Sequence, residues 1–259
     1  IPTEDGIIHG AINQIYSNAE EFYRAENGHA IGYFWGFKTA GIFQNTKEIN
    51  DWIAAGNGVY QSSVQPGDVK YVDVNHDGSI DAKDKVDLGN GLPKYVFGLN
   101  LNLGYKGFDL SLNATGAAGF QIAQSYRDPN SAQANYSRRI LNRWTGEGTS
   151  NYIPRVTYND AGNWQFSDLY LQDGDYIRLQ NITLGYDFKR LISWKGISKL
   201  RLYVQAQNLF TLTKYDGMDP EIGSFNGTDG NNNETWVSGV DMGYYPHPRT
   251  FIVGINLAF

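Results

Sequence analysis

A strict alternation of apolar and polar residues is the feature that most constrains the fold of this chain. From Tyr95 to Tyr105 the odd positions are all apolar or aromatic, whereas the even positions are mostly Gly and Asn. After the dipeptide Lys106-Gly107 the alternation resumes and runs to Thr115. Period two over this length predicts two antiparallel strands joined by a tight turn, each with one apolar and one polar face.

Similar patterns predict further strands along the chain, so the expected fold class is all-β. Residues 176–188 alternate with a phase slip near Gln180, which indicates a bulge, and residues 200–212 and 251–259 alternate as well. The segment 31–43 is a fair strand candidate, and 7–24 is a weaker one. Together these segments give seven candidate strands.

The polar faces of these strands carry Asn, Gln, Gly, Ser and Thr rather than Lys and Glu, which suits a water-filled lumen better than an ordinary surface. The ten steps from Tyr95 to Tyr105 span about 34 Å at roughly 3.4 Å per residue. Tilted by about 45°, the strand rises about 24 Å, close to the roughly 25 Å apolar band of an outer-membrane barrel. A soluble β-sandwich fits the same periodicity and remains an alternative.

The lengths of the connections favour the membrane barrel. The expected loops at 44–93, 119–174 and 213–248 hold 50, 56 and 36 residues, whereas the turns at 25–30, 106–107 and 189–198 hold 6, 2 and 10. Long extracellular loops that alternate with short periplasmic turns are typical of such barrels. Because bacterial barrels have an even number of strands from 8 upward, seven strands predict one part of a larger barrel.

Composition excludes several other classes of protein. With Lys+Arg 21 and Asp+Glu 27 the net charge is −6, which argues against a nucleic-acid partner. The chain has no cysteine and no apolar run long enough for a transmembrane helix. Its four histidines are scattered and match no catalytic motif, and the carboxylates near Asp173 and Asp219 are typical of turns and strand edges. We therefore expect no catalytic residues and no enzyme activity.

A calcium-loop motif is the most specific local signal. Oxygen-bearing residues recur at positions 1, 3, 5, 7, 9 and 12 of the known template, with Gly78 at the turn position 6. Calcium requires six to eight oxygen ligands, which this spacing can wrap around one ion. Position 12 is Asp rather than the usual Glu, and an acidic Asn/Gly-rich turn without metal is the alternative. The predicted Ca²⁺ ligands are Asp73, Asn75, Asp77, Ser79 (through its backbone carbonyl), Asp81 and Asp84.

Tryptophans in the expected outer loops are weak candidates for substrate contacts. Trp144, Trp164 and Trp236 can stack on sugar rings or on peptide side chains, but they serve equally well as packing anchors for long loops.

Several segments resemble the C-terminal blocks of SusC/RagA-like TonB-dependent outer-membrane transporters, in the order of that family and over nearly the whole chain. The segments are IGYFWGFKTAGIF (31–43), GDVKYVDVNHDGSIDAKDK (67–85), RWTGEGTSNYIPR (143–155), DLYLQDGDYIRLQNITLGYDF (168–188), KLRLYVQAQNLFTLTKYDGMDPEIG (199–223) and YYPHPRTFIVGINLAF (244–259). By this resemblance the whole chain, residues 1–259, is identified as the C-terminal portion of a large antiparallel transmembrane β-barrel with long extracellular loops.

The resemblance implies a complete barrel of about 22 strands around a plug, in the outer membrane of a Gram-negative, Bacteroidetes-type bacterium. It implies active import of glycans or peptides, with a SusD/RagB-like surface lipoprotein as a lid and energy from the TonB complex. The plug, the TonB-contacting motif and the N-terminal part of the barrel are expected outside these residues. The residues expected to line the lumen or contact the plug are Asn100, Asn102, Asp109, Asn113, Arg178, Asn181, Arg201 and Gln205.

Two other functional classes stay open at this point. A secreted calcium-dependent carbohydrate-binding module agrees with the calcium-loop motif and the tryptophans. A passive porin-type barrel agrees with the strand pattern and differs from the importer in needing no TonB.

Overall fold

The computed structural model describes residues 5–11, 21–125, 137–157, 162–192, 194–222 and 238–259. The chain divides into two compact units. The sheet unit consists of Pro93–Phe120, Asp173–Glu221 and Tyr244–Phe259, and the connector unit consists of Ile1–Leu92, Gln121–Gln172 and Ile222–Gly243. In the described ranges, no helix has the length and apolar character needed to cross a membrane.

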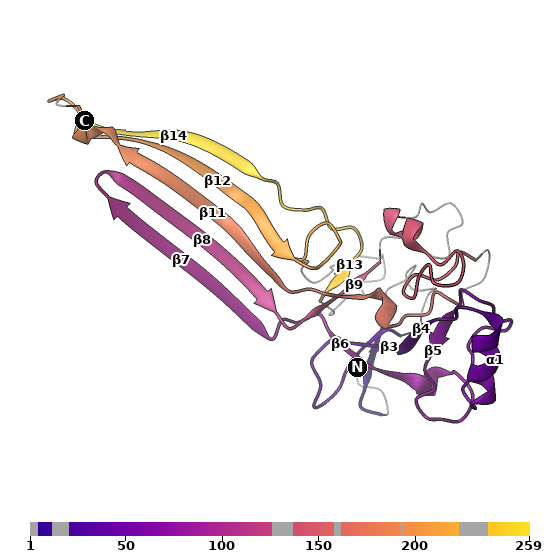
Figure 1. Ribbon diagram of the computed structural model, residues 1–259. Coiled ribbons are helices and arrows are strands. Elements are labelled where there is room, and N and C mark those ends of the chain that lie inside the picture. Colours follow the sequence, from indigo (N-terminus) through magenta and orange to yellow (C-terminus); the bar gives the residue numbers. More distant parts are fainter. Residues whose placement is uncertain (1–4, 12–20, 126–136, 158–161, 193, 223–237) are drawn as a thin grey trace, which may run out of the picture. The chain divides into compact units, whose positions relative to one another are not determined.

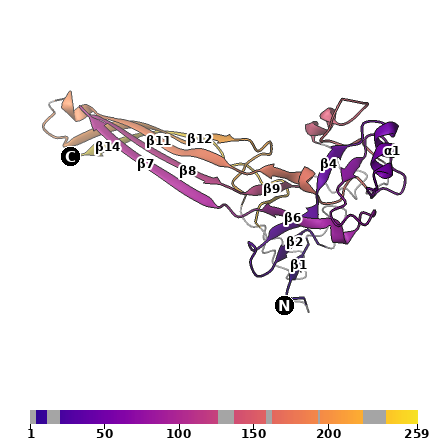
Figure 2. The same ribbon diagram turned by 60° about the horizontal axis from the view of Figure 1, so that its bottom comes forward.

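The sheet unit is built on one sheet of five long antiparallel strands in the order β14-β12-β11-β8-β7. Figures 1 and 2 both show these strands side by side. Their bounds are β7 Tyr95–Tyr105, β8 Phe108–Ala118, β11 Tyr176–Asp187, β12 Lys199–Thr213 and β14 Thr250–Ala258, with a 3₁₀ turn at Phe188–Arg190 after β11.

The predictions for the long strands are confirmed. The turn between β7 and β8 holds Lys106 at φ 46° and Gly107 at φ 94°, the two left-handed positions that a tight hairpin turn needs. The bulge expected near Gln180 appears as a register shift between Leu179 and Asn181 in both pairings of β11.

The register aligns apolar residues across the whole sheet. Leu103 pairs with Leu110, and the same row continues through Leu184 and Val204 to Val253. Because successive side chains of a strand point to opposite faces, an aligned row of this kind makes one face of the sheet continuously apolar.

Two strand glycines make room for aromatic rings. A Cβ on Gly116 would lie 2.4 Å from the ring of Phe97 and 2.6 Å from the carbonyl oxygen of Tyr176. A Cβ on Gly254 would lie 2.3 Å from the ring of Tyr203. The aromatic side chains therefore lie directly over the glycine backbone, a packing that a larger residue would prevent.

The connector unit contains shorter elements in three small sheets, ordered β1-β2-β3-β6, β10-β9-β13 and β4-β5. The bounds of its elements are β1 Ile8–Gly10, β2 Tyr23–Ala25, β3 Tyr33–Phe37, β4 Thr39–Ile42, α1 Thr46–Ala54, β5 Val69–Tyr71, β6 Lys85–Asn90, β9 Gln121–Gln124, β10 Leu171–Asp173, β13 Val240–Asp241 and 3₁₀ turns Ala82–Asp84, Arg138–Asn142 and Asp168–Tyr170.

The structure differs from the prediction over residues 7–43. The strand expected over 31–43 is split into β3 and β4, and the described parts of 7–24 contribute only β1 and the start of β2. None of these strands pairs with the five long ones. β3 reads YFWGF and is largely buried on both faces, so its apolar run reflects a core position rather than an alternating wall strand.

The segments predicted as long loops carry regular structure and share hydrophobic cores. One core joins Phe37, Ile42 and Val69 with the half-buried Trp144. Arg155, in the second predicted loop (119–174), pairs at 2.6 Å with the fully buried Asp68, in the first predicted loop (44–93). This ion pair connects the two loops. Of the described parts of the third predicted loop, 213–221 and 244–248 belong to the sheet unit, and 222 and 238–243 belong to the connector unit.

Candidate functional site

The polar side chains of the long strands gather on one face of the sheet. Asn100, Asn113 and Asn181 are direct cross-strand partners in a single row. Asn102 and Gln205 belong to a neighbouring row of the same face. The structure thus brings together residues that are distant in the sequence and were expected to share a face because of strand alternation.

An ion pair bridges three strands of this polar face. Nε of Arg201 on β12 donates to Oδ1 of Asp109 on β8 at 2.8 Å, and its Nη2 donates to Oδ2. Strand β11 lies between the two partners, and the pair passes over it at Gly185. A Cβ at Gly185 would lie 2.5 Å from the guanidinium and 2.6 Å from Oδ1, so the absence of a side chain permits the bridge.

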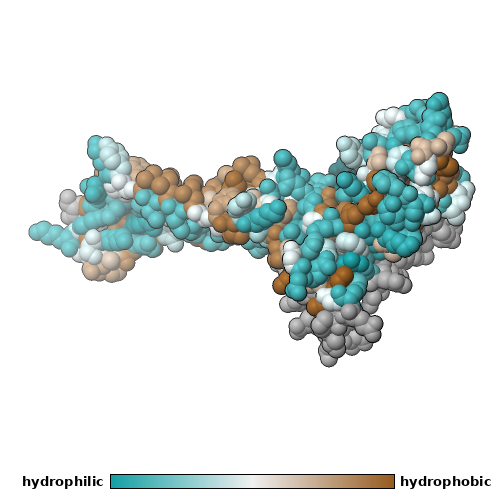
Figure 3. All heavy atoms as spheres, turned by 90° about the horizontal axis from the view of Figure 1, so that it is seen from below, coloured by the Kyte–Doolittle hydropathy of each residue, from teal (hydrophilic) through white to brown (hydrophobic). Residues whose placement is uncertain are grey.

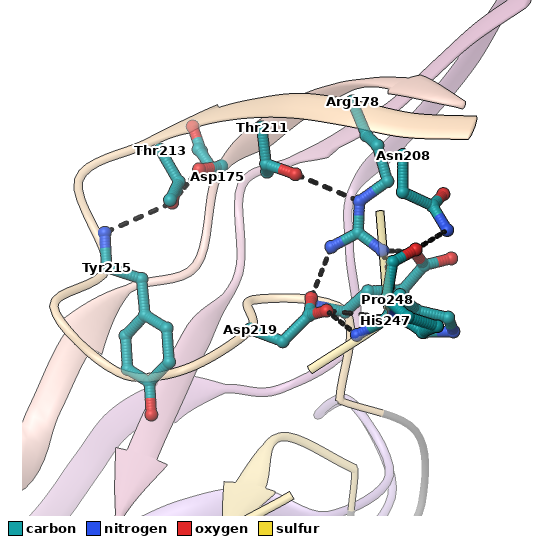
Figure 4. Close-up of polar contacts among 10 residues, drawn as sticks. Asp175, Arg178, Asn208, Thr211, Thr213, Tyr215, Asp219, His247 and Pro248 are labelled. Carbon is teal, nitrogen blue, oxygen red and sulfur yellow. Dashed lines mark hydrogen bonds and ion pairs between the residues drawn. The ribbon is translucent and has the colours of Figure 1, made fainter. Parts of the chain in front are cut away.

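A buried ionic cluster closes one end of the polar face (Figure 4). Arg178 on β11 donates to Asp219, to Oε2 of Glu221 at 2.8 Å and to Oγ1 of Thr211 at 3.0 Å. Nδ1 of His247 lies 3.1 Å from both Nη1 of Arg178 and Oδ2 of Asp219. The side chains of Arg178 and Asp219 are each only 3% exposed. The cluster therefore holds the segment after β12 and the segment before β14 to β11.

The electrostatics of Asp219 fit this role. Burial alone would raise the pKa of its carboxyl, but the backbone N–H groups of Glu221 and His247 and the guanidinium of Arg178 outweigh it, so the pKa lies below its ordinary value. The carboxylate is therefore charged at neutral pH and serves as the acceptor on which the cluster converges.

Smaller contacts support the same connections. Nδ2 of Asn208 donates to the carbonyl oxygen of Pro248 at 3.1 Å, and Oγ1 of Thr213 donates to the carbonyl oxygen of Asp175 at 2.8 Å. The buried Tyr215 donates its backbone N–H to Thr213. Figure 4 shows these residues, with Asn208 and Pro248 beside Arg178 and with Thr213, Asp175 and Tyr215 to its left. We infer that the segment after β12 is held at several points and not by the ion pairs alone.

The expected lumen residues differ in how open they are. Asn100 and Asn102 on the edge strand β7 are exposed, whereas Asp109, Asn113, Asn181, Arg201 and Gln205 are half-buried. Arg178 is buried in its cluster and is not open to a solute. The open part of the polar face presents mainly amide side chains, which donate and accept hydrogen bonds without a fixed charge.

The opposite face of the sheet is apolar and exposed. Leu99, Leu103, Leu184, Val204 and Val253 each expose between 47% and 76% of their surface. Figure 3 shows hydrophobic residues gathered along the stretch formed by the long strands. An apolar face of this extent is unusual for a soluble monomer and indicates a surface that something apolar covers.

The predicted calcium loop lies in the connector unit between β5 and β6. Oδ2 of Asp73 accepts the N–H of Gly78 at 2.7 Å, and Oδ1 of Asp84 accepts the N–H of Val74 at 2.9 Å. Asp84 also caps the 3₁₀ turn by accepting the N–H of Asp81 at 2.8 Å. Asn75, Asp77, Ser79 and Asp81 are exposed, whereas Asp73 and Asp84 are buried. Within the described part of the chain, no three His, Cys, Asp or Glu side chains form a ready-made metal cluster.

The structure describes two of the three candidate tryptophans. Trp144 is half-buried and packs against the connector core beside Gly67, which favours the role of a packing anchor. Trp164 is half-buried. Trp236 lies outside the described residues.

Sequence reasoning did not find the partners of Arg178. Asp219, Glu221 and His247 lie 41, 43 and 69 residues further along the chain. No local spacing connects residues so far apart, and each alone resembles an ordinary turn residue. The one signal available was that Arg178 interrupts a polar face made almost entirely of uncharged residues.

Comparisons with known proteins point to one group. The chain is 32% identical over 234 residues to the TonB-dependent receptor P3 of Formosa agariphila, a match that covers 90% of this chain and 22% of the relative. It is 30% identical over 205 residues to the TonB-dependent receptor SusC of Bacteroides thetaiotaomicron, covering 78% of this chain and 18% of SusC. The chain thus spans about a fifth of the length of these curated relatives. No protein-family profile matches it.

A solved structure has a similar fold. A chain in the structure of the RagAB peptide transporter matches with a TM-score of 0.63 and 23% sequence identity, covering 92% of this chain and 24% of that one. The similarity supports the fold of a partial all-β barrel, in agreement with the five long antiparallel strands.

Proposed function

We propose, from the premise that this chain belongs to the SusC/RagA-like TonB-dependent receptors, that it forms part of the wall of an active importer in the bacterial outer membrane. The complete barrel, of about 22 strands as in the family that the chain resembles, encloses a plug, and the plug and the remaining strands come from outside these residues. This chain needs the N-terminal part of the barrel and the plug in order to form a closed, transporting barrel.

The observation that carries the proposal is the two-faced sheet of the sheet unit. Five aligned strands of 9 to 15 residues present one exposed apolar face and one face of amides, hydroxyls and paired charges. Strands of about 9 to 11 residues are long enough to cross a bilayer when tilted. The apolar face suits contact with lipid, and the polar face suits contact with a water-filled lumen.

The remaining functional assignments rest on the family. Its members include receptors named for their dependence on TonB and a chain of the RagAB peptide importer. We therefore assign to the complete protein uptake of glycans or peptides, energy transfer from the TonB complex, and a SusD/RagB-like lipoprotein lid. The localisation is the outer membrane of a Gram-negative, Bacteroidetes-type bacterium. The work of the protein is binding and conformational gating, without a covalent reaction.

Co-purification tests the assembly. The native protein is extracted from membranes with detergent, captured through this chain, and its companions are identified by mass spectrometry. We expect a barrel-and-plug portion, in the same polypeptide or tightly bound, together with a surface lipoprotein. Recovery of the chain alone from the soluble fraction would overturn the proposal in favour of a secreted module.

Genetic removal of TonB tests the source of energy. We expect uptake of the ligands that co-purify with the lipoprotein to stop in a strain that lacks TonB, while the receptor remains in the outer membrane at its normal level. Uptake that continues at the wild-type rate would mean a passive porin-type barrel, because a porin needs no energy transfer from the inner membrane.

A further inference from the structure

A buried carboxylate oxygen in the connector unit has no partner. Asp73 is 2% exposed, and its Oδ1 is buried without a hydrogen bond. Its other oxygen accepts the N–H of Gly78, five residues later, so the carboxylate lies inside the turn that these residues form. Among the described residues, no Lys, Arg or His pairs with Asp73. Burial of an unpaired charge is costly, so a bound cation would stabilise this carboxylate where no protein side chain does so.

Further oxygen donors surround this position along the same loop. Asn75, Asp77, Ser79 and Asp81 follow at alternate positions, and Asp84 ends the loop at position 12. Backbone geometry turns the chain tightly here, with His76 at φ 60° and Gly78 at φ 84°. These twelve residues carry four carboxylates, one of which, Asp81, lies 3.9 Å from the exposed Lys83. The local charge therefore favours a divalent cation.

We propose that residues 73–84 bind one Ca²⁺ ion through Oδ1 of Asp73, the side chains of Asn75, Asp77, Asp81 and Asp84, and the backbone carbonyl of Ser79. The buried Asp73 and Asp84 form the fixed base of the site. The exposed side chains at 75, 77 and 81 turn toward the ion, which explains why the carboxylates do not already converge on one point. Oxygen ligands of mixed type and flexible placement suit Ca²⁺ better than Mg²⁺, which demands a near-ideal octahedron.

The position of the loop gives the ion a structural consequence. The loop connects β5 to β6, and its Ile80 packs into the core with Val69 and Tyr71. Gly58, after helix α1, lies so close that a Cβ there would be 2.8 Å from the backbone of Ser79. An ion that fixes residues 73–84 therefore stabilises β5, β6 and the turn after α1. This inference does not depend on the import function.

Hydrogen exchange of the full-length receptor in detergent tests the site. Peptides covering 69–90 are followed in EDTA, in 10 mM CaCl₂ and in 10 mM MgCl₂. With a dissociation constant of about 10⁻⁴ M, which is usual for extracellular sites, 10 mM Ca²⁺ increases protection by about 100-fold. We expect this increase with Ca²⁺ and a much smaller one with Mg²⁺. Equal protection in EDTA and Ca²⁺ would overturn the proposal.

Asp73→Asn separates a cation site from a merely structural carboxylate. Asn keeps an acceptor for Gly78 and removes the buried charge, so in EDTA the variant should be at least as protected as the wild type, yet it should gain nothing from Ca²⁺. An unchanged Ca²⁺ response would contradict the assignment. If Asp73→Asn fails to fold, the exposed pair Asp77→Asn/Asp81→Asn carries the same test. The matched control is Asp51→Asn on helix α1, where an exposed Asp pairs with Lys47 and the Ca²⁺ response should persist.

Discussion

Removal of the charge of Arg178 tests the buried cluster most sharply. Arg178→Gln leaves the carboxylate of Asp219 buried and without its cation, and both side chains are 3% exposed in the wild type. Loss of one partner from a buried pair costs about 3–5 kcal/mol. The additional bond to Glu221 adds little, because that carboxylate is 38% exposed. We therefore expect the connection between β11 and the segment after β12 to weaken by about 3 kcal/mol or more.

The assay is hydrogen exchange of the full-length receptor, read on peptides that cover 214–222 and 244–249. Since about 1.4 kcal/mol corresponds to a tenfold change in an equilibrium constant, protection there should fall by at least about 100-fold. Asp219→Asn should cost a similar amount, and the double variant should cost clearly less than the sum, because the two groups act as one pair. Lys214→Gln is the control: its side chain is 86% exposed and 3.9 Å from Asp173, so protection should hardly change. A change below threefold in Arg178→Gln, or fully additive costs, would refute the reasoning.

Three further predictions concern the sheet, the pH dependence and the connector unit. Gly116→Ala should lower the free energy of unfolding by about 1–3 kcal/mol in urea titrations, because its Cβ would meet a backbone oxygen at 2.6 Å, whereas Gly98→Ala, with its nearest atom at 3.9 Å, should be tolerated. The lowered pKa of Asp219 means that its stabilising contribution is complete above its unfolded pKa of about 3.9 and is lost as the pH falls through the lower folded value. The protection factors of 214–222, in which the observed exchange rates are corrected for the intrinsic pH dependence of amide exchange, should thus be constant from about pH 5 to 8 and fall below about pH 4. In Asp219→Asn this fall should be absent. Asp68→Asn should weaken the attachment of segment 143–157 by about 3 kcal/mol, because Arg155 loses the charge of its fully buried partner. Limited proteolysis should therefore cut that segment faster in the variant than in the wild type. An unchanged rate of cleavage would contradict this prediction.

The sequence predicts the long strands because their information is local. Alternation along 95–118 sets both strands and their shared face, and the slip at Gln180 marks the bulge. Period two follows from the geometry of a single strand, so it needs no knowledge of the partner strand. The shared polar face of Asn100, Asn113 and Asn181 follows in the same way.

The connector unit and the ionic cluster were beyond such reasoning. Segment 31–43 reads as a wall strand, but it forms two short strands, and the first of them, β3, buries both faces in cores assembled from distant segments. The pairing of Arg155 with Asp68 and that of Arg178 with Asp219 join residues 87 and 41 positions apart. Long-range pairs of this kind depend on the register of the whole fold, which no local pattern contains. The calcium motif, by contrast, is local in sequence and awaits its binding test.

We propose above that the five-stranded sheet separates lipid from a water-filled lumen. The most direct measurement places single spin labels on β7 in the membrane-embedded receptor, by cysteine substitution at Leu99, Asn100, Leu101, Asn102 and Leu103, in a chain that has no cysteine of its own. We predict that labels at the three odd positions collide with oxygen dissolved in the lipid, and that labels at the two even positions collide with a water-soluble nickel complex. Equal access of the nickel complex to all five positions would contradict it.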